Sequence, residues 1–363
     1  MPSAVVNDVK LVNFCVAIFK KIGVSEADAK IVADNLVASD LRGIPSHGVA
    51  RLKRYVDGIK EGIILPNVKP KILKETPVTV AISAENGLGQ PAGYFAMNLA
   101  IDKAKKSGLG FATVRNSNHY GIAGYYALMA LKHDLIGISM TNSEPLVVPT
   151  FSKDMIIGTN PISIAVPAGK ERSYVLDMAT SVVPRGKFEV YLRNEKEVPL
   201  GWAVDQEGLP TTDTKLVIDN MTKTAGGGIL PLGGEGELHS GHKGYGLSLL
   251  VDILSGILAG SDFGPYVKSK KRGTKTFINV GHFFGAIKIE NFIELDKFKS
   301  TMDEMIQTMK SSQKAKGQNR VYIHGEKEFE KSEEYKKNGV PLGEKVVDTL
   351  KQLGQESGVP YNL

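Results

Sequence analysis

The chain has few of the residues that hold disulfide-rich or zinc-built proteins together. Among its 363 residues there is one cysteine, Cys15, so neither an intramolecular disulfide nor a thiolate zinc cage can form. Cys15 lies in an apolar segment of helical periodicity, which predicts a buried structural thiol. Polar residues interrupt the N-terminal segment, so we expect no secretory signal and a cytoplasmic location.

Long hydrophobic runs are also missing. The most apolar stretch, 244–260, contains Asp252, two serines and several glycines. It is too short and too polar to span a membrane, so no membrane partner is expected. Hydrophobic residues make up 42% of the chain and charged residues 23%, which is typical of a globular protein, and the length suggests roughly two domains.

The charge of the chain is only moderately skewed. Lys and Arg number 45 against 39 Asp and Glu, a formal net charge of +6. This balance suits an anionic ligand, and it equally suits a solvated lysine-rich surface. The basic segment 268–275 has no interleaved aromatic residues, so we predict no nucleic-acid partner.

The hydrophobic periodicity divides the chain into helical ends and a mixed middle. The first ~65 residues and the last ~65 read as helices. Their signals are an apolar stripe of Val5, Val9, Val12, Val16 and Phe19, a capping box of Ser25 and Asp28, a helix opening at Pro45, a core stripe of Phe298, Met302, Met305, Ile306 and Met309, and an amphipathic piece over 348–356.

The middle of the chain predicts strands that alternate with helices. Strands are expected at 78–82, 110–114, 136–140, 162–166, 175–176 and 276–289, helices at 94–106 and 247–258, and loops over 219–246. The fold class is therefore α/β. The predicted domains are 1–75 and 295–363, which together form one helical domain, and 76–294, an α/β domain.

A glycine motif between the first strand and its helix imitates a dinucleotide fingerprint. Gly87, Gly89 and Ala92 match G-x-G-x-x-A, but the second strand offers no acidic residue to hold a ribose, and Pro91 stands where the helix should begin. We therefore predict an ordinary strand-to-helix turn, not a Rossmann-type site.

Two histidine segments point to acid–base chemistry. In a helix, His47, Arg51 and Tyr55 would share one face, with an imidazole, a carboxylate clamp and a phenol side by side. His119 follows a predicted strand within 116–121, a usual place for catalytic loops. The alternatives are a charged surface helix and a simple turn.

Other polar clusters are less specific. Thr159 belongs to a polar cluster, 158–161, at the end of a predicted strand. Asp177, which also lies at a strand end, could orient a histidine or cap a turn. Lys243 precedes an apolar helix and could meet a phosphate, although the P-loop spacing is absent. His239 and His242 lack a third ligand, so no metal site is predicted.

Together these segments resemble the malate/L-lactate dehydrogenase family that also contains sulfolactate, ureidoglycolate and diketogulonate oxidoreductases, which is unrelated to Rossmann-type dehydrogenases. The matching stretches are SHGVARLKRY (46–55), NGLGQPAG (86–93), NSNHYG (116–121), TNSEP (141–145), GTNP (158–161), LDMATS (176–181), GHKGYGLSLLVDILSG (241–256) and HGE (324–326).

The resemblance implies a non-Rossmann α/β cofactor domain, a helical domain built from both termini, and a homodimer. It implies hydride transfer between NAD or NADP and a small 2-hydroxy or 2-oxo acid, foremost malate and oxaloacetate; the alternatives are lactate, sulfolactate or a cyclic imino acid. The implied catalytic residues are His47, His119 and Asp177, the substrate contacts Arg51, Tyr55 and Thr159, and the cofactor contacts Ser143, Asp177, Met178, Ala179, Lys243, His324, Gly325 and Glu326.

Two positions depart from the family pattern, His324 where proline is usual and the Val183-Pro184 pair before Arg185. On this basis we expect His47 to give its proton to the substrate oxygen, His119 to polarise the carbonyl, and Arg51 to hold a carboxylate. A different class, a non-enzymatic anion-binding protein, would instead bind its ligand with strong salt dependence and no nicotinamide chemistry.

Overall fold

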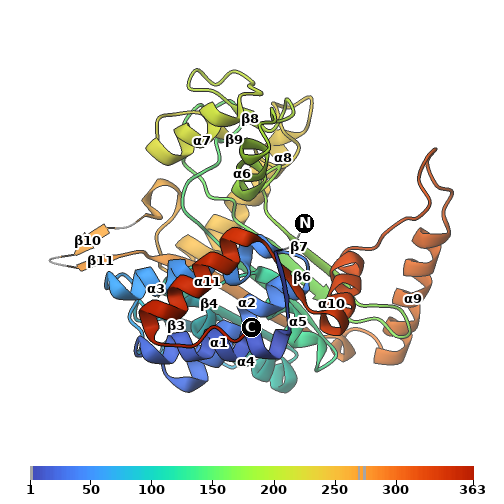
Figure 1. Cartoon of the computed structure of the whole chain (residues 1–363). Coiled ribbons are helices and arrows are strands. Elements are labelled where there is room, and N and C mark those ends of the chain that lie inside the picture. The colour runs from blue at the N-terminus through green and yellow to red at the C-terminus, as the bar shows by residue number, and fades with distance from the viewer. Residues whose placement is uncertain (1–2, 269, 273–274) are drawn as a thin grey trace.

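A computed structural model describes residues 3–268, 270–272 and 275–363, and the side chains of 269–276 lie outside the described part. A seven-stranded sheet occupies the centre, helices from both termini lie together on one side, and a smaller lobe stands above (Figure 1). The fold class predicted from the sequence, α/β, is confirmed.

The central sheet has the strand order β2-β3-β4-β12-β5-β6-β7. Its strands are β2 (Lys71–Glu75), β3 (Thr79–Ser83), β4 (Leu109–Ser117), β5 (Leu135–Thr141), β6 (Ile162–Val166), β7 (Tyr174–Met178) and β12 (Val280–Lys288). Within this sheet β3 and β4 pair in parallel, and a helix connects one to the other. All other neighbouring strands of the sheet pair antiparallel. The last of these strands along the chain, β12, lies between β4 and β5, so β4 and β5 are not neighbours in the sheet.

Helices cover both faces of this sheet. On one face α4 (Gly89–Ser107) and α5 (Ala123–Leu131) pack their alanines and Met97 against β3, β4 and β12. On the other face α8 (Gly241–Asp252) and the π-helical turn η3 (Ile253–Ile257) pack Val251 and Leu254 against Met140 and Phe283.

The two termini share one hydrophobic core, as predicted. It joins α1 (Asp8–Lys21), α2 (Glu26–Leu41) and α3 (Leu52–Lys60) to α11 (Glu344–Ser357), which lies beside the blue N-terminal helices in Figure 1. The strands β1 (Ala4–Val6) and β13 (Val340–Leu342) pair antiparallel and tie the two ends together. The capping box also forms, because the Ser25 Oγ accepts the Asp28 N–H at 3.2 Å and begins α2.

The lobe has its own small core. It contains α6 (Arg185–Arg193), α7 (Thr214–Lys223), β8 (Ala203–Val204) and β9 (Gly228–Ile229), packed around Phe188, Val217 and Ile229. The predicted loop region 219–246 is therefore wrong in part, since α7, β9 and the first turns of α8 lie within it. The hairpin β10 (Lys270–Arg272) and β11 (Lys275–Phe277) occupies the basic segment.

Two predicted core stripes are buried only in part. Val5, in β1, and Val9, in α1, are 59% and 61% exposed, because the helix begins only at Asp8 and centres its buried face on Phe14 and Ile18. In α9 (Leu295–Ser311) only Ile306 is buried, while Met305 and Met309 are 43% and 49% exposed. Both stripes are therefore right in part. Phe19 and Ile306 are buried, and Val12 and Val16 pack against the shared core, whereas the remaining residues of each stripe lie toward the edge of the buried face.

The helices before β13 differ in their packing. The Asp303 carboxylate of α9 accepts the amides of Gly169, Lys170 and Glu171 between β6 and β7, whereas α10 (Glu326–Asn338) lies against α2 and packs Tyr335 against the shared core. The buried C-terminal residues of that core lie within 340–359, and the boundaries proposed at 75 and 295 stay predictions.

Candidate active site

Two cavities lie on either side of the segment that joins α2 to α3. Ser46 and His47 line a cavity of about 330 Å³, here called the histidine cavity, whereas Arg42 and Ile44 line a second one of about 270 Å³, here called the Asp177 cavity. The same short segment therefore contributes to both.

The segment is not the single helix that the spacing predicts. Residues Pro45–His47 (η1) and Val49–Arg51 (η2) form two 3₁₀ turns, separated by Gly48 in an extended conformation. The buried Asp40 causes the break: its Oδ2 accepts the Val49 N–H at 2.7 Å, and a Cβ at position 48 would collide with its carboxylate. The turns nevertheless bring His47 and Arg51 to one cavity.

The two predicted histidines meet in this cavity. The His47 and His119 rings stack with centroids 5.4 Å apart and an interplanar angle of 25°. Ser46 Oγ lies 3.0 Å from His47 Nδ1, and the Tyr55 hydroxyl lies 2.6 Å from His119 Nδ1. Because the Gly121 N–H also donates to His119 Nδ1 at 3.3 Å, the Nε2 of a neutral His119 bears the proton.

Both imidazoles are neutral at pH 7. Burial, together with the nearby Arg51 and Arg54, lowers the pKa of His47 to about 4. Burial, followed by the charge of Arg54, lowers the pKa of His119 well below 6.5. The main cause of the lowered His47 pKa is desolvation, and the two arginine charges add to it.

Free guanidinium groups give the cavity its charge. Arg51 donates its Nε–H to the Ser46 carbonyl at 2.7 Å but has no ion pair, and Arg54 has neither a side-chain hydrogen bond nor an ion pair among the described residues. Arg185 pairs with Glu189 at 3.1 Å, and the exposed Glu144 completes the charged lining. Arg54 was not predicted as a site residue, although it stands three residues after Arg51 in the same motif.

The floor of the cavity is a set of hydrogen-bonded polar residues next to the ends of strands β5 and β6. The Thr159 N–H donates to Ser143 Oγ at 3.1 Å, and both residues line the cavity. Behind them His282, on β12, contacts Thr141 through Nδ1 at 2.7 Å and Ser117 through Nε2 at 2.8 Å. His282 therefore connects the strand before His119 to the strand before Ser143.

Tyr55 and Asp177 do not make the contacts that the sequence predicts for them. Tyr55 is buried beneath the cavity, where its hydroxyl orients His119. The Asp177 carboxylate accepts the Gly124 N–H at 2.8 Å and lines the Asp177 cavity, so it orients neither imidazole. Burial raises the Asp177 pKa to about 6, against the opposing effects of Gly124 and Arg42.

The segment 322–328 closes the Asp177 cavity. The Val175 N–H donates to the His324 carbonyl at 3.0 Å, which fixes this segment against β7. Gly325 has a φ of +89°, and a Cβ there would lie 2.8 Å from the Val175 Cβ, so both its conformation and its contact require glycine.

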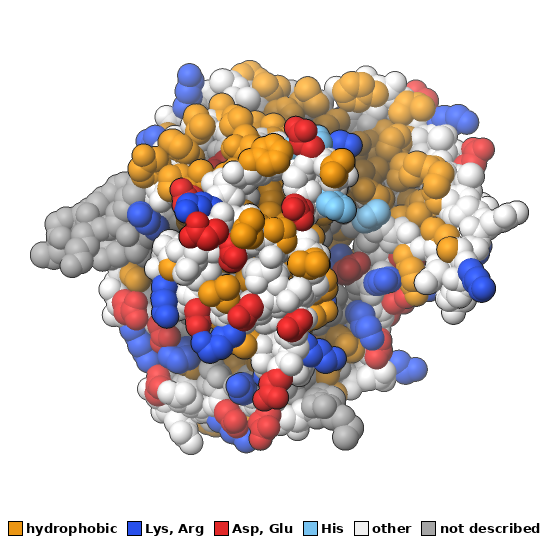
Figure 2. All heavy atoms as spheres, turned by 90° about the horizontal axis from the view of Figure 1, so that it is seen from above, with side chains coloured by type: hydrophobic (Ala, Val, Ile, Leu, Met, Phe, Trp, Pro, Cys, Tyr) orange, Lys and Arg blue, Asp and Glu red, His pale blue; other side chains and the backbone are white. Residues whose placement is uncertain are grey.

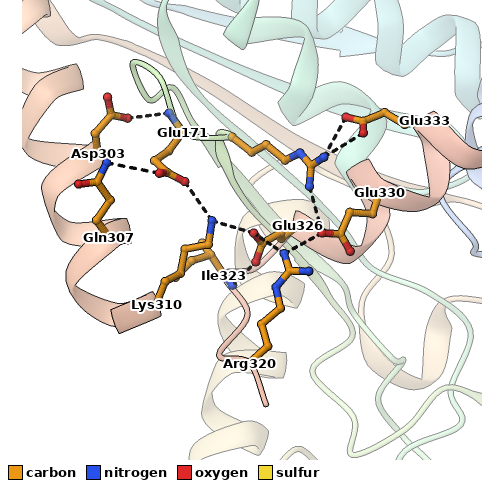
Figure 3. A network of polar contacts seen from close by, with 10 residues as sticks. Glu171, Asp303, Gln307, Lys310, Arg320, Ile323, Glu326, Glu330 and Glu333 are labelled. Atoms are coloured by element: carbon orange, nitrogen blue, oxygen red, sulfur yellow. Dashed lines mark hydrogen bonds and ion pairs between the residues drawn. The ribbon is translucent and has the colours of Figure 1, made fainter. Parts of the chain in front are cut away.

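Glu326 is engaged by the protein itself. Its side chain is 5% exposed and pairs with Lys310 at 2.8 Å and Arg320 at 2.7 Å, while the Ile323 N–H donates to it at 3.2 Å. Figure 3 shows this network joining α9, the segment before α10 and the β6–β7 loop. Glu326 thus anchors the segment that contains His324 and Gly325.

Other predicted cofactor residues lie outside the cavities. Met178 ends β7, Ala179 follows it, and Lys243 is exposed in the first turn of α8; none of the three lines either cavity. Conversely, Arg42 and Lys327 line the Asp177 cavity, although only their charge distinguishes them in the sequence.

The glycine motif has a packing role. A Cβ on Gly89 would collide with the carbonyl oxygens of Asn118 and His119, so this glycine lets α4 approach the histidine loop. Its φ is not positive. The motif lines neither of the two cavities, in agreement with the prediction that it is a turn.

Neutral imidazoles beside guanidinium groups without ion pairs form a cavity whose side chains are suited to acid–base chemistry. Among the described residues, no group of three or more His, Cys, Asp or Glu side chains is placed to hold a metal ion, and none of the helices is long and apolar enough to cross a membrane.

Comparison with known proteins identifies the class. The family model described as malate/L-lactate dehydrogenase matches residues 6–351. A malate dehydrogenase of Pyrococcus horikoshii is 52% identical over 96% of this chain and 94% of its own, and an L-sulfolactate dehydrogenase of Methanocaldococcus jannaschii is 41% identical over 97% and 96%. The crystal structure of malate dehydrogenase from Entamoeba histolytica superimposes with a TM-score of 0.95 at 38% identity, covering 99% of each chain.

The chain belongs to the malate/L-lactate dehydrogenase family and is an oxidoreductase of that family. The resemblance found in the sequence is therefore confirmed, and the non-enzymatic alternative is set aside.

Proposed function

We propose that the chain transfers a hydride between a nicotinamide cofactor and a dianionic 2-oxo or 2-hydroxy acid, foremost oxaloacetate and malate. The observation that carries this proposal is the pair of guanidinium groups without ion pairs, Arg51 and Arg54, beside His47 and His119 in one cavity. Two cations suit a substrate with an acidic group at each end. The names of two relatives support a dianionic substrate, since malate and sulfolactate are both dianions.

Substrate binding and proton transfer are coupled by charge. Arg51 and one neighbouring arginine hold the two acidic groups, which places the C2 oxygen between the imidazoles. Burial is the main cause of the lowered His47 pKa, and the charges of Arg51 and Arg54 lower it further. A bound dianion offsets these two charges and raises the pKa, which favours uptake of a proton by the imidazole as the substrate binds. His47 then gives this proton to the C2 oxygen, while the Nε2–H of His119 donates a hydrogen bond to it.

The residues of the Asp177 cavity fit a nicotinamide dinucleotide. Arg42 is buried there with its Nε unpartnered, and Asp177 offers a carboxylate for a hydroxyl group. When bound, the reduced cofactor supplies the hydride to C2. Ser143 and Thr159, at the floor of the histidine cavity, and the end of β7 are placed to position it. Both NAD and NADP belong to this proposal.

The proposal includes a homodimer. The exposed side of α8 and η3 is apolar: Leu247, Leu250, Ile253, Ile257 and Leu258 are 37–60% exposed. In the view from above, hydrophobic side chains gather over a broad area of the surface of the molecule (Figure 2). A contiguous apolar helix face of this kind is typical of an interface between subunits. A cytoplasmic location, as the sequence predicts, completes the proposal.

A substrate panel tests the reaction. Purified protein is given NADH or NADPH with oxaloacetate, sulfopyruvate, pyruvate or a cyclic imino acid, and the nicotinamide absorbance is followed. We expect the two dianions to have the highest kcat/KM, and Arg54→Met to lower kcat/KM for them by about 10-fold or more while pyruvate changes little. The control is Lys53→Met, on the same helix but outside the cavity. Inactivity of the folded protein with every compound would contradict the proposal.

A further inference from the structure

His282 is a fully buried histidine to which the proposed reaction assigns no role. It lies on β12, between β4 and β5 in the central sheet. Burial lowers the pKa of its imidazole to about 3, so the ring is neutral at pH 7. A neutral imidazole in a protein core needs one hydrogen-bond donor and one acceptor, and the residues that supply them show what the ring holds together.

One side of the ring holds the loop that contains His119. The Nε2 atom of His282 lies 2.8 Å from the hydroxyl of Ser117, the last residue of β4. The ring also stacks on Tyr120, with centroids 4.5 Å apart and an interplanar angle of 9°. The pairing of β12 with β4 shifts its register between Val280 and His282, an irregularity of the kind that redirects a side chain. His282 thus contacts the chain on both sides of His119.

The other side of the ring holds the end of β5. The Nδ1 atom of His282 lies 2.7 Å from the hydroxyl of Thr141, the last residue of this strand. Thr141, Asn142 and Ser143 follow one another in the lining of the histidine cavity. The Asn142 side-chain oxygen accepts the Gly281 N–H at 2.9 Å, so a second contact fixes the same segment to β12. A displaced His282 ring would therefore displace the cavity wall that contains Ser143.

The ring separates two walls of one cavity. His119 and Tyr120 belong to one wall and Thr141 and Ser143 to the other, whereas His282 lies behind both and is closed off from solvent. Since each hydroxyl can donate or accept, both contacts are satisfied in either tautomer of the ring. Hydride transfer depends on a fixed separation between the reacting groups, because a misplacement of about 1 Å can lower the rate by about 10²-fold.

We propose that His282 is a positioning residue that sets the separation between His119 on one wall and Ser143 on the other. This inference rests on the proposed function, in which His119 contacts the C2 oxygen and Ser143 helps to position the cofactor. The contact with Ser117 then controls mainly the rate of the reaction, and the contact with Thr141 controls mainly cofactor binding. The two effects can be separated, because each contact uses a different nitrogen of the ring.

Two substitutions remove one contact each. The amide nitrogen of an asparagine lies near the position of Nδ1, and that of a glutamine near the position of Nε2. His282→Asn therefore keeps the contact with Thr141 and loses the one with Ser117, and His282→Gln does the reverse. His282→Leu removes both. Phe283→Leu is the matched control, since Phe283 is the next residue of β12 and is buried beside α8, outside the cavity lining.

Steady-state kinetics and titration calorimetry of the cofactor measure the two effects on the full chain. We expect His282→Asn to lower kcat about 10-fold or more and to change the dissociation constant of NAD(P)H by no more than about 2-fold. His282→Gln should weaken cofactor binding about 5-fold, with a smaller loss in kcat, and His282→Leu should do both. Phe283→Leu should lower the unfolding temperature and leave both constants unchanged.

A double-mutant cycle tests the route of the effect. Ser117→Ala should lower kcat in the unaltered chain but add nothing to His282→Asn, where the contact is already lost. Fully additive losses would overturn the inference, and so would unchanged constants in a folded His282→Leu or equal losses in His282→Asn and His282→Gln.

The ring signal of His119 separates this inference from the proposed function. In nuclear magnetic resonance spectra of the chain with isotope-labelled histidine, this signal is assigned from its loss in His119→Gln. It should shift more in His282→Asn than in His282→Gln, and equal shifts would overturn the inference. An unaltered chain that is inactive with every compound of the substrate panel contradicts the proposed function, and the inference then stands or falls with this signal.

Discussion

At the scale of single residues, the two imidazoles differ in what their Nδ1 atoms contact. His119 receives hydrogen bonds at Nδ1 from Tyr55 and Gly121, which leaves Nε2–H as a fixed donor. His47 contacts only the Ser46 hydroxyl through Nδ1 and lies among charges that a bound dianion would offset. This contrast supports His47 as the group that exchanges a proton, and His119 as the group that polarises the carbonyl.

The division of roles predicts different kinetic effects. His47→Ala should lower kcat by about 10²-fold or more, the usual effect of losing an acid or base, and leave NAD(P)H affinity unchanged. His119→Ala should act more on KM, with a smaller loss in kcat. Steady-state kinetics with calorimetric cofactor binding would check both, and the reverse pattern would assign the proton to His119.

The pH dependence follows from the lowered pKa of His47. Oxidation of the hydroxy acid needs a neutral imidazole as base, so kcat/KM for malate should hold from pH 8 to well below 6.5 and fall only as the pH approaches about 4. Since Arg54 lowers the pKa of both histidines, Arg54→Met should move this acidic limb to higher pH.

At the scale of the elements, the approach of α4 to the histidine loop depends on one glycine. A Cβ on Gly89 collides with the backbone carbonyls of Asn118 and His119, so alanine there must push α4 and the loop apart. The G-x-G-x-x-A motif marks Gly89 as a turn residue, whereas the close approach of two backbone carbonyls is what requires glycine at this position.

Gly89→Ala should therefore cost about 1–3 kcal/mol in the free energy of unfolding, as overpacking does, and lower kcat through the displaced His119. Cofactor affinity should change little. Urea unfolding and calorimetry would measure these effects against Gly343→Ala, where a Cβ meets no atom within 4 Å and φ is negative. A large loss of cofactor affinity at normal stability would instead revive a dinucleotide site at this motif.

At the scale of the whole molecule, the exposed apolar side of α8 and η3 needs a partner. Leu250→Lys combined with Ile257→Lys places two charges in the centre of the proposed interface. We expect light scattering after size exclusion to change from a dimeric to a monomeric mass. Leu73→Lys, on the exposed strand β2, is the control and should stay dimeric. A dimer that survives the double change would contradict this interface.

Local sequence features predict most of the elements. The strand 162–166 is found as predicted, and Ser25 begins α2, because alternation and capping depend on neighbouring residues only. The stripes of α1 and α9 have a helical period, but which face is buried depends on partners far along the chain. For α1 these include α11.

The site divides in the same way. Because a short motif fixes which side chains are available, the segment 46–55 by itself contains His47, Arg51 and Arg54 within eight residues, and the match of the motifs to a family implied the reaction class. The separation of Asp177 from the histidines, the use of Tyr55 to orient His119 and the burial of Arg42 depend on how β7, α3 and α10 pack. Contacts between segments separated by tens or hundreds of residues arise from packing, and no local pattern encodes them.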